Sequence, residues 1–133
     1  MAALPSPLFG AEPRKRILVV DDDEPTARML GHFLRGYDVD LAGNGLEGIE
    51  RAIAHRPDLI LADVWMPELD GIEMVRQLHR DPTLAHVPVI FVSAAGDAQH
   101  VAAAISVGAR HFLAKPIDVK KLLGLVRKAL GVP

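Results

Sequence analysis

Short apolar runs of strand length occur along most of the chain and are separated by segments with helical periodicity. Continuous apolar runs are typical of strands covered on both faces. The segment 37–42 instead alternates between apolar and acidic residues, which predicts an edge strand. The other predicted strands are 17–20, 59–62, 87–92 and 111–114.

The first two predicted helices are bounded by proline and glycine. Pro25 stands where a first helical turn would begin, Gly36 ends that helix, and the second helix stops before Pro57. Apolar residues recur at helical spacing in both segments, which indicates one face packed on the core. The residues expected on these inward faces are Met29, Leu30, Phe33, Leu34, Leu46, Ile49, Ala52 and Ile53.

Three further helices are predicted in the second half of the chain. One covers 71–80, and another runs from about 99 to 107 and ends at Gly108, a residue favoured just past a helix. Asp118 is expected to cap the last helix. The inward-facing residues expected in the first and last of these helices are Ile72, Val75, Leu78, Val119, Leu122, Leu123, Val126 and Leu130.

This alternation of five strands with five helices predicts an α/β fold, a doubly wound parallel sheet with helices on both faces. Right-handed crossovers leave few topologies, and we expect the flavodoxin-like (βα)5 arrangement with strand order 2-1-3-4-5. The length of 133 residues fits one such domain, which we place at 15–131. Prolines and a glycine interrupt the segment before it, so 1–14 is expected to be a flexible N-terminal tail.

Composition narrows the function classes. The net charge of −2 gives no reason to expect direct contact with nucleic acid or an anionic membrane, and no apolar run has the length of a membrane span. The absence of cysteine is compatible with a cytoplasmic protein. No output region follows Leu130, so we expect either a stand-alone domain or a part of a longer chain.

Polar residues follow the predicted strands where a parallel sheet of this kind binds its ligands. Asp21, Asp22 and Asp23 follow the first strand, and Asp63, Ser93 and Lys115 follow the third, fourth and fifth strands, respectively. Clustered carboxylates need a counter-charge, which Mg²⁺ supplies while sharing a phosphate oxygen. A carboxylate nucleophile, a divalent cation, a lysine and a hydroxyl are the groups needed to move a phosphoryl group onto an aspartate.

The chain resembles the receiver domains of two-component response regulators in four segments: 17–24 (ILVVDDDE), 61–71 (LADVWMPELDG), the pair Ser93-Ala94 and the pair Lys115-Pro116. The resemblance extends from Ile17 to about Leu130. It implies a signalling switch, not an enzyme acting on other substrates. A sensor histidine kinase or histidine phosphotransfer protein would donate the phosphoryl group. A downstream protein or output domain would bind the face formed by the last two helices and the fifth strand.

The resemblance also implies a role for each matching residue. Asp63 would be the phosphoacceptor, and Asp21, Asp22, Asp63 and the Trp65 backbone carbonyl would hold Mg²⁺. Ser93 would hydrogen-bond the phosphoryl oxygens and Lys115 would pair with them. Ser93 and Phe112 would be the switch residues, and the Lys115–Pro116 bond would be cis.

The same residues fit other functions less well. An aspartate-nucleophile phosphohydrolase is the main alternative, but its D-x-D-x-T pattern would need the threonine one position before Thr26. A flavin-binding domain of the same fold would need polar and aromatic loops rather than clustered acids. The segment 43–48 matches the G-x-G-x-x-G dinucleotide motif. It follows a half-polar second strand, so we interpret its glycines as a turn and the start of a helix.

Overall fold

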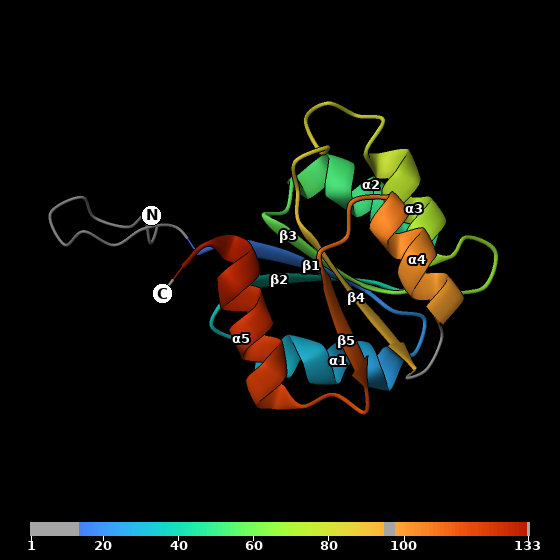
Figure 1. The fold of residues 1–133 in the computed structure, drawn as a ribbon. Helices are drawn as coiled ribbons and strands as arrows, with labels where there is room; N and C mark the ends of the chain where they lie inside the picture. Colours follow the sequence, from blue (N-terminus) through green and yellow to red (C-terminus); the bar gives the residue numbers. More distant parts are fainter. Residues whose placement is uncertain (1–13, 95–97, 133) are drawn as a thin grey trace, which may run out of the picture.

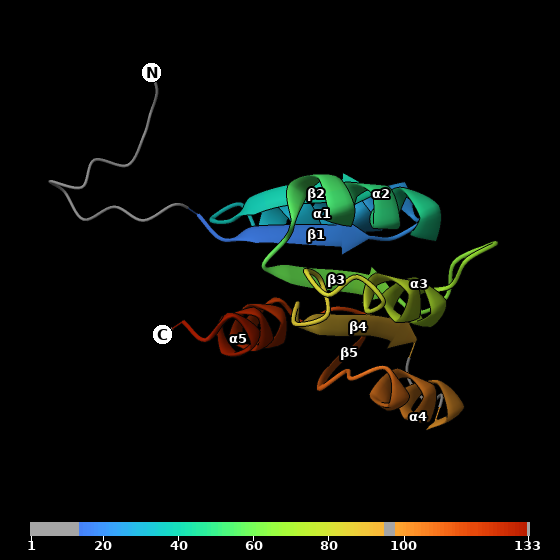
Figure 2. The same ribbon diagram turned by 90° about the horizontal axis from the view of Figure 1, so that it is seen from above.

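The computed structural model describes residues 14–94 and 98–132. Within these residues, five parallel strands form one sheet in the order β2-β1-β3-β4-β5, as predicted. Figure 2 shows this order along the sheet. The strands are β1 (Arg16–Val20), β2 (Asp38–Ala42), β3 (Leu59–Asp63), β4 (Val89–Ala94) and β5 (His111–Lys115). Apart from Arg14, the predicted tail lies outside the described residues.

The helices cover both faces of this sheet, α2, α3 and α4 on one face and α1 and α5 on the other (Figure 1). Their bounds are Glu24–Phe33 for α1, Gly45–His55 for α2, Gly71–Leu78 for α3, Ala98–Ser106 for α4 and Val119–Leu130 for α5. In the described part of the chain, no helix combines the length and apolar character needed to cross a membrane.

Alternate side chains of the central strands pack into two separate hydrophobic cores, one on each face of the sheet. In β1, Leu18 and Val20 belong to the core covered by α2, α3 and α4, whereas Ile17 and Val19 belong to the core covered by α1 and α5. This is why 17–20 is apolar throughout: each side chain meets a helix whichever way it points. Of the residues predicted to face inward, Leu30, Leu34, Ala52, Ile72, Val75, Leu78, Leu122 and Val126 are buried.

Polar residues begin the helices at the edge of the sheet where the strands end. Asp23, Asn44, Asp70 and Asp118 each accept a hydrogen bond from a backbone N–H in the first turn of the helix that follows. These caps satisfy donors that the helix itself leaves unpaired. The predicted cap at Asp118 is confirmed.

The prediction of which residues of α2 face inward is partly wrong. Leu46 and Ile53 are 54% and 52% exposed, while Gly45 and Gly48 are buried. A Cβ atom on Gly48 would lie 2.6 Å from Met74 Sδ, so this glycine lets α2 approach α3 and β1 closely. The glycines of the 43–48 segment therefore serve helix packing. Met29, predicted to face inward in α1, is also 39% exposed.

Candidate functional site

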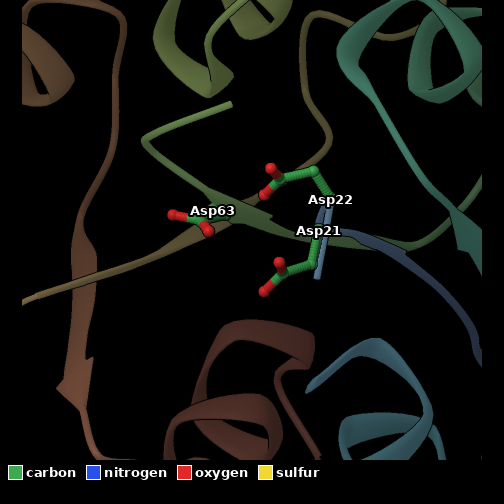
Figure 3. A group of neighbouring side chains, drawn as sticks. All are labelled: Asp21, Asp22 and Asp63. Atoms are coloured by element: carbon green, nitrogen blue, oxygen red, sulfur yellow. The ribbon is translucent and has the colours of Figure 1, made fainter. Parts of the chain in front are cut away.

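Three carboxylates gather at the edge of the sheet where β1 and β3 end (Figure 3). Asp21 and Asp22 directly follow β1, and Asp63 is the last residue of β3. One oxygen from each carboxylate lies within 4.8 Å of the other two. The three carboxylates differ in burial: Asp21 is 2% exposed, Asp63 is 7% exposed and Asp22 lies at the surface.

Both oxygens of Asp63 have a defined donor. The backbone N–H of Trp65 donates to Oδ1 at 3.1 Å, and the Lys115 ammonium donates to Oδ2 at 3.0 Å. Gly71 brings the start of α3 against the backbone carbonyl of Asp63, where any Cβ atom would collide with it. The carboxylate is thus held in one orientation on a rigid, buried strand end.

Asp21 is a buried carboxylate whose two oxygens have different surroundings. Its Oδ1 accepts the Asp23 backbone N–H at 2.9 Å, whereas its buried Oδ2 accepts no hydrogen bond from the described residues and lies 3.6 Å from Lys115 Nζ. Burial raises the pKa of the Asp21 carboxyl above its ordinary value, and repulsion from Asp63 adds to this effect. The Asp23 N–H and the Lys115 charge oppose the increase.

Lys115 supplies the positive charge of the site from the end of β5. Burial alone would lower the pKa of its ammonium, but the hydrogen bond to Asp63 and the charge of Asp21 raise it above its ordinary value. When all three carboxylates are ionised, this one ammonium leaves two negative charges uncompensated.

The donor set fits a hard divalent cation such as Mg²⁺. Such an ion takes carboxylate oxygens and retains several waters. The buried Oδ2 of Asp21, which has no hydrogen-bond donor among the described residues, and the exposed carboxylate of Asp22 offer oxygens beside Asp63. The three aspartates could therefore hold the ion at the mouth of the site.

The remaining predicted site residues lie around this cluster. Ser93 is partly exposed at the end of β4, where its hydroxyl donates to the Ala94 carbonyl at 3.2 Å. Trp65 is 54% exposed on the loop after β3. Phe112 is half-buried and stacks on Phe91, with ring centroids 6.3 Å apart. The Lys115–Pro116 bond is cis, as predicted.

Two residues had structural roles that the sequence analysis did not identify. Asp23, which it grouped with the chemical residues, caps α1 by accepting from both the N–H and the hydroxyl of Thr26. An aspartate just before a proline of the first helical turn, here Pro25, is a helix-start pattern that could have identified this role. Gly71 permits the close approach of α3 to Asp63, and no hydrophobicity pattern indicates such a contact.

Comparisons with known proteins agree with this geometry. A family model described as the response regulator receiver domain matches residues 17–127. RpaA of Synechocystis, a DNA-binding dual master transcriptional regulator, is 37% identical over 86% of this chain and 48% of its own length. The polar-differentiation response regulator DivK of Brucella anthropi is 34% identical over 88% of this chain and 97% of its own.

A solved structure shows the same architecture. The chemotaxis protein CheY4 of Vibrio cholerae superposes with a TM-score of 0.83 at 28% identity, covering 87% of this chain and 98% of that one. The chain spans about half the length of several curated relatives that it matches, including RpaA and the response regulator ArlR of Staphylococcus saprophyticus.

Proposed function

Because the chain belongs to the response regulator receiver domain family, a family of two-component signalling switches, we propose that Asp63 is its phosphoacceptor. The observation that carries this proposal is the position of the Asp63 carboxylate between the Lys115 ammonium, at 3.0 Å, and the acidic pair Asp21 and Asp22. The donor is a sensor histidine kinase or a histidine phosphotransfer protein.

In the proposed reaction, a carboxylate oxygen of Asp63 attacks the phosphorus of the donor. The new O–P bond forms as the bond between phosphorus and the donor breaks, and the donor keeps the electron pair of that bond. Lys115 and the Trp65 N–H hold the carboxylate in place before the reaction. The carboxylate therefore loses little orientational freedom in reaching the transition state.

Mg²⁺ is the proposed cofactor, held by Asp21, Asp22, Asp63 and the Trp65 backbone carbonyl. When bound, it supplies charge neutralisation for the carboxylates and the phosphoryl oxygens. Asp21 and Asp22 contribute the carboxylates that place this charge beside Asp63.

Lys115 and Ser93 would carry the signal away from Asp63. After transfer, the ammonium of Lys115 pairs with a phosphoryl oxygen, and the Ser93 hydroxyl leaves the Ala94 carbonyl to hydrogen-bond another. Phe112 lies on β5 and packs against the core that α4 shares with α2 and α3, and it is the proposed switch aromatic. The rearranged surface of α4, β5 and α5 then binds a downstream protein or an output domain.

The proposed domain, 15–131, acts on no substrate other than its own phosphoryl group, and we place it in the cytoplasm. It makes no direct contact with nucleic acid in this proposal, although RpaA, a longer relative, is a DNA-binding regulator. The phosphohydrolase alternative gains no support, because the Thr26 hydroxyl is bonded to the capping carboxylate of Asp23.

Intact-mass spectrometry after incubation with acetyl phosphate tests the proposal. We expect one added phosphoryl group per chain in the presence of Mg²⁺ and none when the divalent cation is chelated. Equal labelling with and without the cation would overturn it.

A further inference from the structure

A second pocket lies at the opposite end of the strands from Asp63. It is a cavity of about 560 Å³ where β4 and β5 begin, bordered by the ends of α3, α4 and α5. This volume is within the range of small-molecule sites. Its apolar lining includes Val87, Val89, Val107 and Ala129.

The charged groups of this pocket are all basic. Arg110 and Lys128 line it together with His79, His86 and His111, and no carboxylate lines it among the described residues. No ion pair joins either Arg110 or Lys128 to a carboxylate in residues 14–94 and 98–132. Both cations line the same pocket as His111. Burial lowers the pKa of His111, and the charges of Lys128 and Arg110 lower it further.

Helix ends explain only part of this charge. Lys128 lies in the last turn of α5, where a cation complements the helix dipole. Arg110 has no such role, since it lies between α4 and β5, beyond the helix. The end of α4 is also largely satisfied, because the N–H groups of Gly108 and Ala109 donate to the carbonyls of Ile105 and Ala104. A helix C-terminus carries roughly half a negative elementary charge, so the ends of α3, α4 and α5 together offset about 1.5 of the two positive charges and leave a small positive excess.

We propose that this pocket binds a small organic anion, with a phosphate or carboxylate group at Arg110 and Lys128 and an apolar or planar body against the valines. Charge-assisted hydrogen bonds to the two cations fix the anionic group. Because the lining is largely apolar, we expect the pocket to bind an organic anion with an apolar or planar part more tightly than a bare inorganic ion.

Backbone NMR titration of the full chain tests the proposal, without phosphodonor or divalent cation, so that the outcome does not depend on Asp63. The probes are AMP, benzoate, inorganic phosphate and uncharged adenosine. We expect AMP or benzoate, or both, to shift the amides of Gly108, Arg110 and His111 saturably, and the stronger of the two identifies the phosphate or the carboxylate as the preferred group. Inorganic phosphate lacks the apolar or planar part, and adenosine lacks the anionic group. Each should therefore bind at least about tenfold more weakly than the better probe.

Variants locate the binding. Arg110→Gln and Lys128→Gln should each weaken the better probe by about tenfold, as expected for a lost charge-assisted hydrogen bond. Lys128→Arg keeps the positive charge and should retain binding. That result would show that the end of α5 tolerates substitution. Arg127→Gln, which removes a neighbouring charge outside the pocket, is the matched control and should change the affinity less than about twofold. Absence of saturable shifts, equal binding of adenosine or phosphate, or equal losses in Lys128→Gln and Arg127→Gln would overturn the proposal.

Discussion

The ammonium nitrogen of Lys115 lies 3.0 Å from Oδ2 of Asp63, although the two residues are 52 positions apart in sequence. The same nitrogen is 3.6 Å from Asp21 Oδ2. Lys115 is therefore already paired with the carboxylate that we propose to be modified. A phosphoryl group on Asp63 would present it with a stronger, displaced negative charge.

Lys115→Ala should accept a phosphoryl group at a reduced level but respond poorly to it, because the cation that meets the new charge is missing. The measurement compares backbone NMR shifts with and without a beryllofluoride adduct at the site. We expect most of the shift changes in β5 and α5 to disappear. Lys120→Ala, which removes an exposed lysine of α5, should respond like the wild type. A full response of Lys115→Ala would remove this residue from the switch.

Asp22→Ala should weaken Mg²⁺ binding by at least about tenfold, since changing even a residue behind the metal ligands typically costs that much. The fold should survive because Asp22 is exposed and its loss relieves repulsion among the acids. The fluorescence of Trp65, the only tryptophan of the chain, reports the titration next to the site. Asp38→Ala, at the opposite end of the sheet, controls for the loss of one negative charge. Equal Mg²⁺ affinities for the two variants would place the ion elsewhere.

Gly48→Ala should destabilise the protein by about 1–3 kcal/mol, the typical cost of overpacking a core. The added methyl would lie 2.6 Å from Met74 Sδ and 3.1 Å from Val20. Gly124→Ala in α5 is the matched control, because no neighbouring atom of the described residues lies within 4 Å of its Cβ position. That variant should gain about 0.5–1 kcal/mol from helix propensity. Urea unfolding of both variants measures the difference, and similar stabilities would contradict this packing account.

Trp65 is expected to slow the loss of the phosphoryl group from Asp63. Hydrolysis needs a water in line with the Asp63–phosphorus bond, and the family resemblance places Trp65 and Ala95 beside that approach. The indole N–H donates but cannot accept a proton from the water, and Ala95, which lies outside the described residues, offers no hydrogen-bonding side chain.

The double variant Trp65→Asn, Ala95→Glu supplies amide and carboxylate groups that can orient the water. It should lose the phosphoryl group about tenfold faster or more, the low end of what positioned acid–base groups contribute. The decay is followed after removal of the donor, with Mg²⁺ in excess. Decay at the wild-type rate would refute the lifetime account and leave the assignment of Asp63 untouched.

The strand positions and topology were predictable because each strand end carries a distinct signal. The apolar run 17–20 stops abruptly at Asp21, and the prolines and glycines around the helices limit where each strand can begin. The acidic cluster followed from topology alone, since parallel strands bring their carboxyl ends to one edge. The boundaries of β4 shifted by two residues, to Val89–Ala94.

The packing of α2 could not be predicted in the same way. Counting apolar residues places Leu46 and Ile53 inside, but contact through Gly45 and Gly48 turns another face of the helix inward. A hydrophobicity pattern also cannot distinguish the burial of Asp21 from that of Asp22, because both are aspartates. The structure separates them, burying Asp21 beside Lys115 and leaving Asp22 exposed, because consecutive residues leaving a strand point in opposite directions.

Phosphorylation of Asp63→Asn measures the central claim most directly. The wild type, Asp63→Asn and the matched control Asp23→Asn, whose side-chain amide oxygen can still cap α1, are incubated with acetyl phosphate and Mg²⁺. The phosphoryl group is then counted by intact mass and located by peptide mapping. The account predicts one group on the wild type and on Asp23→Asn, within the peptide that contains Asp63, and none on Asp63→Asn. Labelling of Asp63→Asn at the wild-type rate would contradict it.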